Sequence, residues 1–335
     1  MRQLQEAENK AREQQAAFDD LGLAADELAL LRHHAATARE LGPGNAWVEQ
    51  VARELVPQLG REHRFLMHFV LSFAALHLAR LQPDQLPRWA AAADQHLAGG
   101  LRGVAQVLPA LSPANCHAVY VSACFVCFCA FAGGPRRGEC LLFGTHDDGD
   151  DDSGAAFLLL MRGVRQIVEA VGEEAVFSGL LRACPRPERA DLPAGQGLHR
   201  PRRVEWAGPV GRLRAFVDSS ADACADAVLR AVDDLARCFG DTCGDGAGGA
   251  RPQEQAILAW LFRISTQDRF VECLRQERPL ALLVLAHFAV LLRMLDHVWF
   301  MAGWAGHILA AVRDIIGGQY GEQLAWPMQE VGVPA

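Results

Sequence analysis

The chain has 335 residues, a formal net charge of -8 and a pI near 5.8. This acidic balance argues against a protein whose main task is to bind phosphate backbones, because that task needs concentrated positive charge. Lys10 is the only lysine, which also argues against a Walker-type phosphate loop and a Schiff-base enzyme, since each needs a well-placed lysine.

Composition favours helices. Hydrophobic residues make up 51% of the chain and aromatic residues only 7%. Ala and Leu supply most of the apolar fraction, and both favour helix over strand. Neither an internal repeat nor an alternating strand-like pattern stands out. The predicted fold class is therefore all-α, with a single large helical domain.

The N-terminal half contains several predicted helices. Residues 1–24 read as a polar helix or linker, and residues 25–335 as the helical domain. Within it, residues 24–41 form a short amphipathic helix, residues 65–80 an almost wholly apolar helix that Pro83 ends, and residues 88–108 an Ala-rich helix. Ser112 and Pro113 are expected to open the next helix, as a cap and a first-turn proline, and it runs to Gly133.

The C-terminal half alternates between loops and apolar helix. We predict mobile loops near residues 144–154, 185–209 and 240–252, which are acidic, Pro/Arg-rich and Gly-rich respectively. Pro279 then opens an apolar run over residues 280–292, and Gly303 and the Gly317-Gly318 pair divide the region that follows into successive buried helices. The run is too short for a membrane span, since Arg293 and Asp296 follow it at once.

The cysteines indicate a reducing compartment. Ten cysteines in 335 residues are fewer than small secreted disulfide domains carry, and the N-terminus has no signal peptide. Cys124 and Cys127 form a CxxC, but it sits in the middle of a predicted helix among aromatic residues without a second ligand pair. We therefore interpret these thiols as core residues and predict no metal site here.

Other candidate sites fail on spacing. His68 and His77 lie on opposite faces of their helix at ~100° per residue, so they cannot share a metal ion. His287, His297 and His307 are interpreted as histidines with ordinary hydrogen-bond partners. The acidic loop from Asp148 lacks the glycine and glutamate of a calcium loop, at Ser153 and Leu159. Since no catalytic motif is found either, we predict that the protein is not an enzyme.

A ligand cavity is the remaining chemical possibility. Large apolar and sulfur-containing side chains on the most apolar helices could line such a cavity, although filling the core is the commoner role of these residues. The ligand-pocket candidates are Met67, Phe69, Phe73, Tyr120, Cys124, Phe157, Met161, Phe288 and Met294.

Several apolar segments, in their order along the chain, resemble a known family. They are Leu30-Leu-Arg-His-His34, Phe65-Leu-Met-His68, Ala74-Ala-Leu-His-Leu78, Phe157-Leu-Leu-Leu-Met-Arg-Gly-Val164, Pro279-Leu-Ala-Leu282, Gly303-Trp304 and Trp326-Pro327-Met328. Together they look like the C-terminal regulatory domain of fungal zinc-cluster transcription factors of the sterol uptake control type. The resemblance spans roughly residues 25–335.

The resemblance implies a helical regulatory domain that senses a hydrophobic ligand, such as a sterol, and controls RNA polymerase II target genes in the nucleus, with shuttling from the cytoplasm. A zinc cluster with CxxC-x6-C spacing would bind the DNA, but the first cysteine here is Cys116. We therefore expect no cofactor in this chain, zinc only in a missing N-terminal cluster, and DNA contact only through that module or a partner. A homodimer stays open. The alternative function is a ligand-free helical scaffold for protein interactions.

Overall fold

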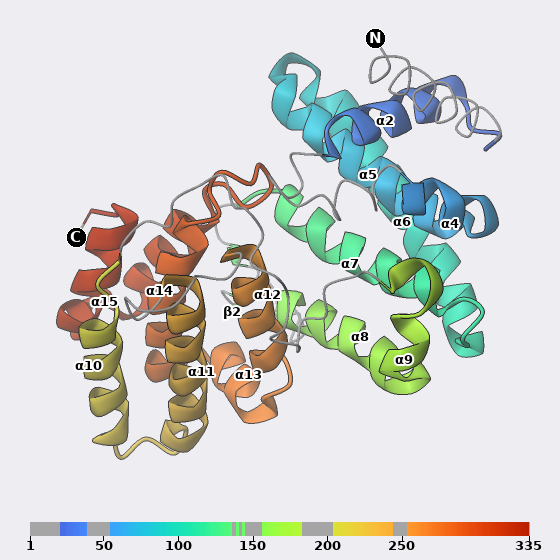
Figure 1. The fold of residues 1–335 in the computed structure, drawn as a ribbon. Helices are drawn as coiled ribbons and strands as arrows, with labels where there is room; N and C mark the ends of the chain where they lie inside the picture. The colour runs from blue at the N-terminus through green and yellow to red at the C-terminus, as the bar shows by residue number, and fades with distance from the viewer. Residues whose placement is uncertain are drawn as a thin grey trace, which may run out of the picture. The chain divides into compact units, whose positions relative to one another are not determined.

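A computed structural model describes residues 21–38, 54–135, 139–140, 143–144, 156–182, 204–243 and 253–334. These residues are almost entirely helical, which confirms the predicted all-α class (Figure 1). The chain divides into two compact units. Unit 1 comprises residues 1–133 and 164–184, and unit 2 comprises residues 134–163 and 185–335. The predicted boundary of a regulatory domain at residues 25–335 stays a prediction.

Unit 1 is built around a central apolar helix, α5 (Arg64–Leu81). It packs against the other main helices of the unit, which are α2 (Ala25–Ala36), α4 (Val56–Glu62), α6 (Leu86–Val107) and α7 (Cys116–Ala132). Shorter segments complete the unit: η3 (Pro83–Gln85), η4 (Leu108–Ala110), α9 (Glu173–Val176) and η5 (Gly179–Leu181). By length and composition α5 could cross a membrane, but 67% of it is buried by its neighbours, as in a core helix.

Glycines set the close approach of α6 to α5. A Cβ atom at Gly103 would lie 2.6 Å from the Phe65 Cβ, and one at Gly100 would lie 2.8 Å from the Phe69 ring. Real Cβ atoms do not come so close, so only glycine permits this packing distance. Along this stretch the backbone of α6 consequently packs directly against side chains of α5.

Unit 2 surrounds α14 (Pro279–Arg293), whose residues 280–292 are all buried. The other helices are α10 (Ala207–Asp218), α11 (Ala225–Cys243), α12 (Gln253–Ile264), α13 (Asp268–Arg275) and α15 (Trp304–Val331). A small antiparallel pair, β1 (Glu139–Cys140) with β2 (Phe143–Gly144), places Glu139 opposite Gly144 and Cys140 opposite Phe143. Helix α8 (Ala156–Val171) carries the boundary between the units.

An aromatic stack anchors α14 in this core. The rings of Trp260 and Phe288 lie 4.0 Å apart between centroids with an interplanar angle of 26°, and both side chains are fully buried. His287 is also buried, and its Nδ1 lies 2.8 Å from the Leu283 carbonyl oxygen. The histidine therefore has the ordinary partner that was predicted for it.

Several predicted boundaries shift. The helix expected from Ser112 begins at Cys116, because Ser112 and Pro113 lie in a turn that the Asn115 side chain closes by accepting a hydrogen bond from the Ser112 N–H. Pro279 does occupy the first turn of α14. Residues 207–209 and 240–243 belong to α10 and α11, so the two loops predicted there are shorter than expected. Of the three predicted loops, the structure also describes Gly144, in β2, and residues 204–206. The remaining loop residues lie outside the described residues, as do residues 1–20.

Helix α15 folds back on itself. Gly303 starts it in the left-handed region, with φ 88°, where the sequence predicted a break. The Gly317-Gly318 pair, also predicted to break a helix, lies within α15, and the helical angles are lost at Tyr320, with φ -121° and ψ 26°. Beyond this bend the last turns approach Arg313, whose Nη1 donates to the Pro334 carbonyl oxygen at 2.9 Å.

Candidate functional site

The nine predicted ligand-pocket residues fall into two groups. Unit 1 holds Met67, Phe69, Phe73, Tyr120 and Cys124, and unit 2 holds Phe157, Met161, Phe288 and Met294. The side chain of Phe157 lies outside the described residues. Nothing in either unit tests whether these residues line a ligand site, so this role stays a prediction.

Phe73, one of the unit 1 candidates, lies in an aromatic cluster with Phe125 and Phe128. The Phe73 ring lies 5.9 Å from that of Phe125 and 6.1 Å from that of Phe128, measured between centroids. Phe69 and Phe73 are 0% and 2% exposed. Rings at these distances make favourable edge contacts, so this cluster gives unit 1 a well-packed core.

His34 is the polar member of this cluster. Its ring centroid lies 5.8 Å from that of Phe125, and its Nε2 has no hydrogen-bond partner within the described part of the chain. Burial, with smaller contributions from the neighbouring His33 and His77, lowers the pKa of His34 to about 4. The imidazole is therefore neutral at physiological pH.

The α7 cysteines are poor ligands and nucleophiles. Burial raises the pKa of Cys124 and Cys129 to about 12, and that of Cys127 further. A thiol with such a pKa is almost entirely protonated at neutral pH, whereas metal binding and nucleophilic attack need the thiolate. The CxxC of Cys124 and Cys127 lies within a helix, as predicted. Cys127 and the neighbouring Cys129 are buried in the core of unit 1.

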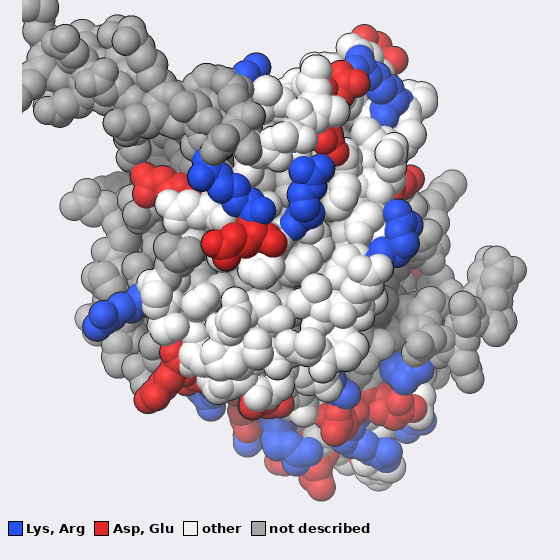
Figure 2. Space-filling model, turned by 90° about the vertical axis from the view of Figure 1, so that its right-hand side faces the viewer, with Lys and Arg blue, Asp and Glu red and all other residues white. Residues whose placement is uncertain are grey.

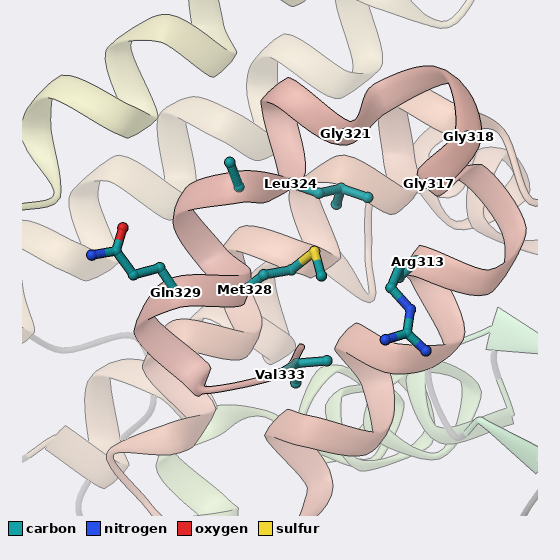
Figure 3. A pocket seen from close by; sticks show the side chains of 9 residues that line it. Arg313, Gly317, Gly318, Gly321, Leu324, Met328, Gln329 and Val333 are labelled. Atoms are coloured by element: carbon teal, nitrogen blue, oxygen red, sulfur yellow. The ribbon is translucent and has the colours of Figure 1, made fainter. Parts of the chain in front are cut away.

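A surface groove lies in the bend of α15, at a place the sequence did not suggest (Figure 3). It has a volume of about 530 Å³ and a mainly apolar lining. The Met328 side chain points across it toward Arg313, from the second half of the helix toward the first. Its lining residues are Arg313, Gly317, Gly318, Gly321, Leu324, Ala325, Met328, Gln329 and Val333.

Arg313 supplies the charged edge of the groove. Its Nη1 binds the Pro334 carbonyl oxygen and its Nη2 lies 2.9 Å from Asp314 Oδ1, while a third of the side chain stays exposed. The groove thus combines apolar walls with one cationic donor, a combination that suits an apolar molecule with a single polar group. The three glycines at the bend were its only signal in the sequence.

Residues that could hold a metal ion lie in unit 1, whereas the groove belongs to unit 2. Among the described residues, Glu27, His68 and His96 form one group whose potential ligand atoms all lie within 4.8 Å of one another. His77, on the same helix as His68, pairs with His33 instead, at 3.2 Å between His77 Nδ1 and His33 Nε2.

Comparison with known proteins gives one informative similarity. No family model matches the chain, and no solved structure matches it. A Zn(2)-C6 fungal-type transcription factor from Gibberella zeae is 23% identical over 319 residues, which cover 90% of this chain. The chain is similar to a fungal zinc-cluster transcription factor.

The similarity to the zinc-cluster transcription factor supports the fungal transcription factor family. The chain spans 61% of the length of this relative. The sterol uptake subtype, which the sequence suggested, stays a prediction.

Proposed function

We propose that the chain is the regulatory part of a fungal zinc-cluster transcription factor that responds to a hydrophobic ligand and controls RNA polymerase II target genes. The observation that carries this proposal is the similarity to such a factor along 90% of the chain. DNA contact would come from a module outside the chain or from a partner, because an acidic chain of this charge binds phosphate backbones poorly.

The groove of α15 is the proposed ligand site. Its volume of about 530 Å³ falls within the range of small-molecule pockets, roughly 300–1,000 Å³. Leu324, Met328 and Val333 would contact an apolar skeleton, while Arg313 would donate to a hydroxyl or carboxylate. A sterol has this chemistry, with one hydroxyl on a rigid apolar ring system, and so does a fatty acid.

Ligand binding is tested by extracting the purified protein with organic solvent and identifying lipids by mass spectrometry, followed by thermal unfolding with added sterol or fatty acid. We expect a stoichiometric lipid, or an increase in the unfolding temperature with ligand concentration. Gly321→Leu should abolish either effect by filling the groove, since a Cβ there meets no atom within 4 Å. Gly211→Leu, at an exposed and equally open helical position, is the matched control.

Regulation is tested separately in a fungal reporter strain. The chain is fused to an unrelated DNA-binding domain, and transcription is measured with and without the extracted ligand. Ligand-dependent activation or repression that Gly321→Leu removes would support the proposal. A fusion that localises to the nucleus yet leaves transcription unchanged under every condition would contradict it.

A ligand-free interaction scaffold is the second candidate function, and exposed leucines favour it. Leu81, Leu86, Leu101 and Leu108 are each about half exposed, at 57%, 50%, 47% and 47%, and come from α5, α6 and η4. Figure 2 shows one face on which a wide uncharged area lies between charged groups near its margins. Large exposed apolar areas are typical of partner surfaces. A lipid-free extract, no thermal response and a partner lost on Leu101→Glu would favour this function.

A further inference from the structure

Three potential metal ligands converge in unit 1 from three different helices. Glu27 comes from the first turn of α2, His68 from α5 and His96 from α6. The Nδ1 atoms of His68 and His96 lie 3.0 Å apart. One potential ligand atom from each of Glu27, His68 and His96 lies within 4.8 Å of the others. We propose that Glu27, His68 and His96 form a binding site for a divalent transition-metal ion of the zinc type.

The separation of the two nitrogens fits metal coordination. Two imidazole nitrogens bound to zinc at about 2.0–2.1 Å and at a tetrahedral angle lie about 3.3 Å apart. The observed 3.0 Å is close to this value. Glu27 must come closer than its present limit of 4.8 Å, and its half-exposed side chain has the freedom to do so.

Helix packing explains why the two histidines meet. A Cβ atom at Gly99, one turn after His96, would lie only 3.3 Å from the His68 ring. Together with Gly100 and Gly103, this glycine lets α6 approach α5 so closely that a ring from each helix shares one space. The pair is therefore held by the backbone packing of two long helices and does not depend on a loop.

Both imidazoles must be neutral for a metal ion to bind them. Burial lowers the pKa of both His68 and His96, although the Glu27 carboxylate opposes this effect. Arg64 and Arg102 lower the pKa of His68 further. In the metal-free protein, a hydrogen bond between the two Nδ1 atoms requires one of them to carry a proton. That proton must move to Nε2 of the same ring before a metal ion can bind both Nδ1 atoms.

Among the described residues, Glu27 makes one hydrogen bond through a single carboxylate oxygen, which leaves the other oxygen available. Its Oε2 accepts a hydrogen bond from the Ala24 N–H at 2.9 Å, at the start of α2. The second carboxylate oxygen would complete a site of two imidazoles and one carboxylate, a set that suits zinc and its neighbours better than calcium or magnesium, which prefer oxygen ligands only. Three protein ligands leave a coordination position for water, since Glu27 and His68 are partly exposed.

A bound ion would link α2 to the α5–α6 pair. Helix α2 is short, and its first turn reaches this pair partly through the half-exposed Glu27. Because binding free energy adds to the stability of the bound form, metal would fix the start of α2. The site is independent of the α15 groove and of the transcriptional function proposed above, so its test can fail without affecting either.

The test uses the whole purified chain, first stripped with EDTA and then titrated with ZnCl₂ by calorimetry, and with CoCl₂ to record visible absorption. We expect one equivalent of Zn²⁺ to bind, a tetrahedral or five-coordinate Co²⁺ spectrum, and slower amide exchange over residues 24–30. MgCl₂ and CaCl₂ should not compete. His68→Gln should weaken Zn²⁺ binding at least 100-fold, and Glu27→Gln, which keeps the bond to the Ala24 N–H, about 10-fold.

His33→Gln is the matched control. It removes one ring of the second histidine pair, His33 with His77, which has similar nitrogen spacing but no third ligand within reach among the described residues. Zn²⁺ binding should be unchanged in this variant. No binding by the native chain, or binding that survives both His68→Gln and Glu27→Gln with native circular dichroism, would overturn the proposal.

Discussion

Arg313 and Pro334 are hydrogen-bonded although 21 residues separate them in the chain. In a straight helix residues so far apart would lie about 30 Å from each other. The bond therefore records the reversal of α15 at Tyr320, which creates the groove. It also joins the two arms of the bend directly.

Arg313→Gln should loosen the last turns of α15. The variant loses the charged donor to the Pro334 carbonyl oxygen, a bond worth about 1 kcal/mol or less at an exposed site. Hydrogen exchange should become faster at residues 328–334 with little change elsewhere. Arg237→Gln, which removes an exposed ion pair with Asp234, serves as the control. Unchanged exchange in Arg313→Gln would show that the bond does not hold the bend.

Gly303→Ala and Gly306→Ala should have opposite effects. Gly303 has φ 88°, where a Cβ costs about 1–2 kcal/mol, even though it would meet no atom closer than 3.9 Å. Gly306 lies in the first turns of α15 with open space around a Cβ, so alanine should stabilise the helix by about 0.5–1 kcal/mol. Urea unfolding measures both free energies. A loss of stability in both variants would contradict this account.

Acidification should destabilise the protein through its buried histidines. Burial lowers the pKa of His34 and His287 to about 4, against 6.5 in the unfolded chain. Below pH 6.5 the unfolded state binds more protons than the folded state, so the free energy of unfolding falls as the pH drops from 6.5 to 4. The loss is on the order of 3 kcal/mol per histidine.

Urea unfolding between pH 7.5 and 4.5 checks this slope. His34→Phe should flatten it, and the new ring fits the site because His34 already packs against Phe73 and Phe125. His297→Phe, at an exposed histidine, should leave the slope as it is. Equal slopes in native protein and His34→Phe would mean that the pKa of His34 is the same in the folded and unfolded states.

Thiol alkylation should spare the α7 cysteines in the folded protein. Cys127 and Cys129 are 5% and 4% exposed, and burial raises the pKa of both thiols. Mass spectrometry after iodoacetamide treatment at pH 8 should show both unmodified, and fully modified once guanidinium unfolds the chain. Rapid modification of Cys127 in the folded state would place α7 at the surface and refute the interpretation of the CxxC as core.

The sequence predicted the helices better than the contacts between them. The burial of α14 follows from its composition, because residues 280–292 offer no polar face. The pairing of His68 with His96 does not, because helical periodicity compares residues on one helix, and these lie 28 positions apart on two. Their approach depends on Gly99, Gly100 and Gly103, which read in sequence only as weak helix positions.

The groove of α15 gave a weaker signal in the sequence than the predicted ligand-pocket residues, whose role stays a prediction. Phe73 and Phe288 are candidates because they have large apolar side chains, and such side chains are as common in a packed core as in a ligand cavity. The groove is instead formed by glycines and by the direction of a bend. That direction is set at Tyr320, two residues beyond the Gly317-Gly318 pair that local propensity favours, and depends on packing and the bond to Pro334.

The complete burial of α14 also matters while the chain is being made. Residues 280–292 leave the ribosome about 40 residues before Val331 completes α15, the helix against which they pack. At about 5–20 residues per second this delay lasts roughly 2–8 s. For that time the apolar segment lacks its main partner, although α11, α12 and α13, which also pack against it, are already made. The face of α14 that α15 later covers is therefore open to other apolar surfaces during synthesis.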